Sequence, residues 1–275
     1  MIQASRGIGA EAIKLYEVAR ITLRSRFRYL WDLIGSTLFL GVVMFVFIRL
    51  WTVTYASNGG SGTIAGFSLA QMIWYLVATE TIIMSMTPIH RNIEREIKDG
   101  DVAIRLNKPL SFLGYHWSVF VGEGLVKALI LIAVGGTVAS LVVGGIQFPA
   151  LQAVLPLFFT FLLTSTLNFL YGAIIGLFAF WTEDITGLFF VVDRVKWLLG
   201  GFLMPISLFP TWLREIVEWL PFSLMIYRPA ELAVNFSLSK WVELTWKQVL
   251  LLVAVAAIAQ GLYKLGVRRL DTNGG

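Results

Sequence analysis

The stretch Leu151–Trp181, LQAVLPLFFTFLLTSTLNFLYGAIIGLFAFW, decides the fold of this chain, because its 31 residues include no Asp, Glu, Lys, Arg or His. About 20 apolar residues in a helix match the roughly 30 Å hydrocarbon thickness of a bilayer. The stretch therefore predicts a transmembrane helix that tilts, kinks or extends past the bilayer. The whole chain agrees, with 57% hydrophobic residues, 14% charged residues and a mean hydropathy of +0.76. We expect an all-α integral membrane protein.

Similar apolar runs, separated by charged or glycine-rich breaks, predict six transmembrane helices. They are Tyr29–Trp51, Phe67–Ile89, Trp117–Val143, Leu151–Trp181, Gly187–Phe209 and Trp246–Leu265. Residues 1–28 place six Lys and Arg between apolar residues at helical spacing, which predicts a cytoplasmic amphipathic helix on the membrane surface. Residues 29–270 then form the six-helix transmembrane domain, and residues 271–275 form a cytoplasmic tail.

The distribution of Lys and Arg predicts the orientation of the chain in the membrane. The loop 90–116 carries five of them, whereas the loops 52–66 and 144–150 carry none. By the positive-inside rule, both termini and the loop 90–116 are cytoplasmic. The segment 207–245 is then external. Its tryptophans, prolines and scattered charges predict short amphipathic, re-entrant helices that dip into the outer leaflet.

Several ionisable residues lie within or near the predicted spans, where a charge costs about 3 kcal/mol or more unless it finds water or a partner. Glu123 and Lys127 are four residues apart and Asp193 and Lys196 are three apart, so each pair can neutralise itself on its own helix. Glu80 has no local partner. Three alternatives are open for this residue: an ion pair with Lys127 on another helix, a contact with a cationic group of the substrate, or a protonated carboxyl group. These residues serve either a transport pathway or the structure.

The sequence offers little enzyme chemistry. The chain has no cysteine, which excludes thiolate metal sites, iron–sulfur clusters and thiol nucleophiles. It has no His-Glu-x-x-His segment, and no Gly-Lys-Ser/Thr follows the glycine-rich residues 59–62. We therefore expect no catalytic residue, metal or cofactor on this chain. We also expect its basic residues to reflect membrane orientation rather than nucleic-acid binding.

The cytoplasmic loop is the most specific part of the sequence. Residues 91–111 read RNIEREIKDGDVAIRLNKPLS. This pattern predicts a short charged helix, a break at Gly100, a second short helix and a stop at Pro109. A rigid element of this kind, joined to the second and third spans, can transmit force from a soluble partner. A plain connecting loop is the alternative.

This loop resembles the first cytoplasmic loop of type-2 ABC exporter permeases. Within that family, the resemblance is strongest to the daunorubicin-resistance-like branch. The resemblance extends to the amphipathic N-terminus, the six spans and the external segment. It implies a homodimer or heterodimer of permeases in the bacterial inner membrane, with two separate ATPase subunits that bind ATP and Mg. It further implies a coupling helix seated on an ATPase, formed by Glu94, Arg95, Glu96, Ile97, Gly100 and Asp101.

The apolar side chains of the spans favour an apolar or amphipathic cargo, such as a lipid, a glycolipid or a drug-like molecule. Two other functions remain open. One is a secondary transporter or channel that uses Glu80 and Glu123 and needs no ATP. The other is a membrane scaffold that transports nothing. An associated ATPase distinguishes the exporter from both.

Overall fold

The structure is a computed structural model that describes residue 17 and residues 30–59, 62–102, 111–145 and 151–273. The predicted amphipathic helix at 1–28 and most of the second half of the cytoplasmic loop fall outside these residues. The described part is helical, apart from one isolated bridge between Ile64 and Phe67. Its longer helices are α2 (Leu30–Ser57), α3 (Leu69–Met84), α4 (Ile89–Lys98), α6 (Phe112–Val143), α7 (Leu151–Leu177), α8 (Thr186–Leu199) and α12 (Leu238–Asn273). Its shorter ones are η2 (Phe178–Phe180), η3 (Ile206–Leu208), α9 (Thr211–Trp219), α10 (Phe222–Met225) and α11 (Tyr227–Val234).

Five stretches of the described chain are long and apolar enough to cross a membrane. They are Thr37–Ser57, Leu69–Lys98, Phe112–Val143, Leu151–Phe180 and Leu238–Arg269. The second contains a break, because α3 ends at Met84 and α4 begins at Ile89. Pro88 lies in this break, where it has no amide hydrogen to continue the helix. Five of the six predicted spans thus lie on helices that are long enough to cross a membrane. The chain is a multi-pass membrane protein.

The predicted fifth span, Gly187–Phe209, is not one continuous helix. Helix α8 has 14 residues, or about 21 Å of rise, which is less than the hydrocarbon thickness. The chain turns after it at Gly200 and Gly201, and Gly201 has φ +76°. The Tyr75 hydroxyl of α3 donates a hydrogen bond to the Gly201 carbonyl and holds the turn in place. The structure therefore does not establish a sixth full-length span.

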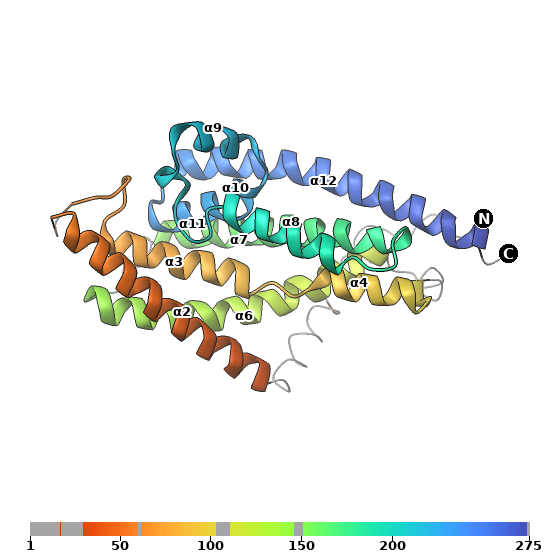
Figure 1. The fold of residues 1–275 in the computed structure, drawn as a ribbon, viewed down its shortest axis with the longest axis horizontal. Helices are drawn as coiled ribbons and strands as arrows, with labels where there is room; N and C mark the ends of the chain where they lie inside the picture. The colour runs from red at the N-terminus through yellow and green to blue at the C-terminus, as the bar shows by residue number, and fades with distance from the viewer. Residues whose placement is uncertain (1–16, 18–29, 60–61, 103–110, 146–150, 274–275) are drawn as a thin grey trace.

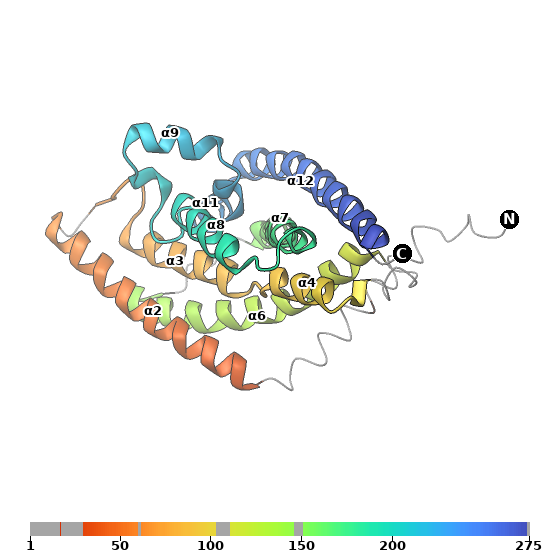
Figure 2. The same ribbon diagram turned by 45° about the vertical axis from the view of Figure 1, so that its right-hand side comes forward.

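Helices α3 and α7 lie at the centre of the bundle (Figures 1 and 2). Helix α3 packs against α2, α6 and α11, and α7 packs against α12 and α4. The two views place α4 and the C-terminal end of α12 at one end of the bundle, and α9 and α11 at the other. In the predicted orientation the first end is cytoplasmic and the second is external.

Candidate functional site

Helix α4 presents two different faces. Ile89, Ile93 and Ile97 recur every four residues and are all buried. The basic residues Arg91, Arg95 and Lys98 are exposed and lie on the outer side of the helix. The helix ends at a glycine, because Gly100 has φ +75° and donates its amide hydrogen to the carbonyl of Ile97. The apolar face thus fixes α4 to the bundle, and the glycine lets the chain turn away.

Two glycines of α7 receive the apolar face of α4. A Cβ atom at Gly172 would lie 2.5 Å from Ile89 Cγ2. A Cβ atom at Gly176 would lie 2.9 Å from Ile93 Cβ and 3.0 Å from the His90 carbonyl oxygen. The backbones approach closely only because both residues lack side chains. Helix α4 therefore packs against α7 at Gly172 and Gly176.

Helix α4 also contacts α8. The His90 ring stacks on Phe189 with a centroid distance of 3.4 Å and an interplanar angle of 14°. The Glu94 Oε1 atom accepts a hydrogen bond of 3.5 Å from the amide of Ile185, just before α8 begins. The same oxygen accepts a hydrogen bond of 2.8 Å from Lys98 Nζ. The start of α8 therefore moves with α4.

A third attachment joins α4 to α6. The Glu96 Oε2 atom lies 3.2 Å from His116 Nε2, and the two side chains are 17% and 5% exposed. His116 itself contacts the ring of Phe112 at the start of α6. A polar contact shielded from water in this way is costly to break, because the partner left behind stays desolvated. Helix α4 thus contacts α6 as well as α7 and the start of α8.

The turn before α8 adds an electrostatic contact. Hydrogen bonds from the hydroxyl and the amide of Thr186 hold the pKa of Asp184 below its usual value, and the nearby Lys98 lowers it further. The Thr186 amide donates to Asp184 Oδ1 at 2.7 Å. Asp184 thus stays ionised beside Lys98 at the exposed end of α4.

The predicted coupling residues divide into two groups. Glu94 and Glu96 contact α8 and α6, and Ile97 is buried, so these three fix α4 within the chain. Arg95, Gly100 and Asp101 are exposed and available to a partner. Arg91 and Lys98 of α4 and Asp99 just after it are also exposed, and of these Arg91 lies outside the predicted coupling segment. Helical spacing from the buried isoleucines could have identified it.

The polar residues of the spans have varied environments. Lys196 Nζ lies 2.8 Å from Asp193 Oδ1, so the predicted pair on α8 is confirmed, and both residues are buried. Glu80 is 2% exposed and has no hydrogen bond or ion pair with any described residue. Glu123 is also buried on α6, four residues before Lys127, and the pairing of these two stays a prediction. Among the described residues, no three His, Asp or Glu side chains cluster in a way that could hold a metal ion.

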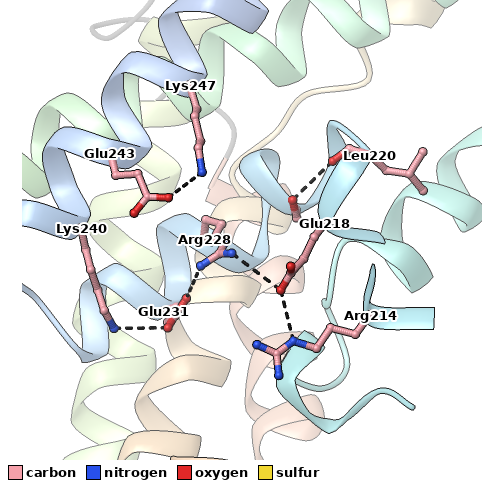
Figure 3. A network of polar contacts seen from close by, with 9 residues as sticks. Arg214, Glu218, Leu220, Arg228, Glu231, Lys240, Glu243 and Lys247 are labelled. Carbon is pink, nitrogen blue, oxygen red and sulfur yellow. Dashed lines mark hydrogen bonds and ion pairs between the residues drawn. The ribbon is translucent and has the colours of Figure 1, made fainter. Parts of the chain in front are cut away.

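A second charged cluster lies at the opposite end of the bundle (Figure 3). Glu218 of α9 contacts Arg214 at 3.1 Å and Arg228 at 3.9 Å. Glu231 of α11 contacts Arg228 at 3.6 Å and Lys240 of α12 at 3.4 Å. These partly exposed pairs each contribute little energy, but together they connect α9, α11 and the start of α12. Whether those helices re-enter the membrane stays a prediction.

The fold defines a multi-pass membrane protein with a short helix, α4, packed at one end of its bundle. A family model described as "ABC-2 family transporter protein" matches residues 22–274. The chain therefore belongs to the ABC-2 transporter family, whose members are membrane permease subunits that work with ABC ATPase subunits rather than ATPases themselves. None of the curated proteins matches this chain. The daunorubicin-resistance-like branch stays a prediction.

Proposed function

We propose that this chain is the permease subunit of an ATP-driven exporter in a bacterial inner membrane, with both termini in the cytoplasm. Two permeases, identical or different, associate with two ATPase subunits that bind ATP and Mg. The cargo is an apolar or amphipathic molecule such as a lipid, a glycolipid or a drug-like compound. Family membership supports the permease role. The attachment of one short helix, α4, to α6, α7 and α8 is the observation that supports the mechanism.

In this mechanism ATP closes the two ATPases, and their movement displaces the coupling segment from Glu94 to Asp101. Because α4 packs without a gap on α7, a push on its exposed face shifts the helix as a body. His90 and Glu94 carry the displacement to α8, and Glu96 carries it to α6. The two permeases then rock, and a path between the first, second and fifth predicted spans opens outward.

The alternative function is transport driven by an ion or proton gradient, and it depends on Glu80 and Glu123. Both are buried, which fits a pathway and also fits a structural role. That alternative predicts gradient-driven transport by the purified chain in vesicles without any ATPase. The exporter predicts no transport under those conditions and ATP-dependent transport once the ATPase is added.

Charge reversal on α4 tests the proposal. Arg95→Glu alters the exposed face of α4 and leaves the buried isoleucine face intact. Glu215→Arg reverses an exposed charge at the other end of the bundle and serves as the matched control. We expect Arg95→Glu to lower ATPase co-purification or transport-coupled ATP hydrolysis by about tenfold, as for a lost charge-assisted contact of about 1.4 kcal/mol. Equal behaviour of both variants and the unmodified complex would remove α4 from the coupling path.

A further inference from the structure

Helix α10 belongs to the predicted external segment but packs inside the bundle, against α7, α8 and α12 (Figure 1). Its backbone is bonded to Asn168 of α7, which lies between Leu151 and Phe180, the ends of a membrane-crossing stretch. It is also bonded to Gln248 of α12, a helix that begins at Leu238. At 1.5 Å per residue, these contacts lie about 15–25 Å along the two helices from their starts.

A proline leaves α10 in need of side-chain donors. In a continuous helix the Met225 carbonyl would accept a hydrogen bond from the amide of residue 229, but Pro229 has no amide hydrogen. The Asn168 Nδ2 atom donates to the Met225 carbonyl instead, at 3.3 Å. The Gln248 Nε2 atom donates to the carbonyl of Leu224 at 2.9 Å. Broken backbone at membrane depth is tolerated only where the protein satisfies it in this way.

The two side-chain amides are anchored, but each is only half satisfied. Asn168 Nδ2 also donates to the Thr164 carbonyl, and Gln248 Nε2 donates to the Thr164 hydroxyl, both at 3.0 Å. The oxygens of the same amides, Asn168 Oδ1 and Gln248 Oε1, are buried and accept no hydrogen bond from any described residue. A buried acceptor without a donor costs free energy, which is regained when water reaches it. The two oxygens therefore lower the free energy needed to open this contact.

The C-terminal end of α8 contacts the same short helix. A Cβ atom at Gly200 would lie 2.7 Å from Ile226 Cδ1 and 3.3 Å from the Phe222 carbonyl oxygen, so α8 ends against α10 without room for a side chain. The other end of α8 is held by α4 through the stack of His90 on Phe189. Helix α8 thus connects α4 with α10.

We propose that Asn168 and Gln248 form a latch, which holds α10 within the membrane and closes the outward side of the permease. The inference rests on the proposed exporter function, because it takes the displacement of α4 as the force that opens the latch. ATP closure displaces α4 and, through α8, draws α10 away from the two amides. The carbonyls of Leu224 and Met225 and the two side-chain oxygens then become hydrated, and the path opens outward.

Thiol labelling of the complex in nanodiscs tests the latch. The chain has no cysteine, so Ser223→Cys places its only thiol on α10, at a side chain that is 2% exposed. Trp219→Cys, at a side chain that is 92% exposed, is the freely reactive reference. Both membrane faces are accessible in a nanodisc, so the assay does not depend on orientation. Reaction of the permease chain with a charged methanethiosulfonate is timed without nucleotide, and again after the ATPases are trapped with ATP and vanadate.

We expect Ser223→Cys to react about tenfold more slowly than Trp219→Cys without nucleotide, and about tenfold faster once ATP closure is trapped. Adding Asn168→Leu and Gln248→Met removes the latch donors and should raise the nucleotide-free rate about tenfold, the ratio for one net hydrogen bond of about 1.4 kcal/mol. Adding Thr160→Val is the matched control. Thr160 is equally buried on α7, but its hydroxyl bonds within that helix, so the rate should not change. If the amide variants do not assemble, the two nucleotide conditions on Ser223→Cys alone decide.

Three results would overturn the latch. Equal rates for Ser223→Cys and Trp219→Cys without nucleotide show that α10 is not held inside the bundle. Protection of Ser223→Cys that persists after ATP trapping makes the two amides permanent supports of the broken backbone instead. An equal effect of Thr160→Val and of the amide variants indicates general loosening of α7. The nucleotide-free measurement is separable from the exporter proposal, which fails on its own if no ATPase associates with the unmodified permease.

Discussion

Substitution of Gly176 by alanine tests the packing on which the coupling of α4 depends. A Cβ atom there would meet Ile93 Cβ at 2.9 Å and the His90 carbonyl oxygen at 3.0 Å, whereas ordinary contact begins at 3.4 Å. The His90 oxygen is a backbone atom, and the Ile93 Cβ atom is bonded to the backbone. A rotamer change moves neither atom, so it cannot relieve the clash. Helix α4 must move by about 0.5 Å, and overpacking of this kind costs about 1–3 kcal/mol.

Two other glycines supply controls for this substitution. Gly261 of α12 has nothing within 4 Å of an added Cβ, so Gly261→Ala reports only the gain in helix propensity, about 1 kcal/mol. Gly172→Ala meets the Cγ2 methyl group of Ile89 at 2.5 Å, and this methyl group is held close to the backbone by the stiff χ1 of a β-branched residue. All three variants share the propensity gain. Their differences therefore isolate the packing cost, which should be present for Gly172 and Gly176 and absent for Gly261.

The assay combines thermal unfolding with coupled activity. Melting of the purified permease is followed by tryptophan fluorescence, and ATP hydrolysis per molecule transported is measured in the assembled complex. We expect Gly176→Ala to be less stable than Gly261→Ala by about 1–3 kcal/mol and to hydrolyse more ATP per transport event. If the two variants melt and couple alike, α4 does not rest on α7 as described.

Three further predictions concern buried charges and the end of α4. Asp193→Ala leaves Lys196 buried without its partner and should destabilise the permease by about 3–5 kcal/mol in thermal unfolding, whereas the double change with Lys196→Met should recover most of the loss. Glu96→Ala leaves His116 desolvated and should cost about 1–3 kcal/mol; an unchanged melting curve would argue against the contact. Gly100→Ala imposes a left-handed conformation on a residue with a side chain and should cost about 1–2 kcal/mol, with reduced ATPase association in a pull-down.

The long spans were predictable because their information is local. A run such as Leu151–Trp181 carries enough apolar surface to predict a crossing helix by itself, and α7 lies within it. Helix α8 shows the limit of this reasoning. Its apolar composition continues past Gly200, but the chain turns at Gly200 and Gly201, and Tyr75, more than 100 residues earlier, donates a hydrogen bond to the Gly201 carbonyl. Hydropathy contains no signal for that contact.

The candidate site was partly predictable for the same reason. The isoleucines of the cytoplasmic loop and the glycine spacing of α7 are both visible in the sequence, but neither pattern shows that they pack on each other. Glu96 was predicted to belong to the coupling helix, which stays a prediction, and the structure adds its contact with His116 of the next span. Such a pairing depends on how two helices are placed in space, which a single sequence does not encode locally.

Chemical crosslinking tests most directly whether energy enters through α4. The chain has no cysteine, so one introduced cysteine is its only thiol. With a bifunctional thiol–amine reagent, Arg95→Cys on the exposed face of α4 should crosslink to the co-purified ATPase subunit. Trp219→Cys, at a residue that is 92% exposed at the opposite end of the bundle, should not. Crosslinking of the ATPase at position 219, or none at position 95 in an intact complex, would contradict the account.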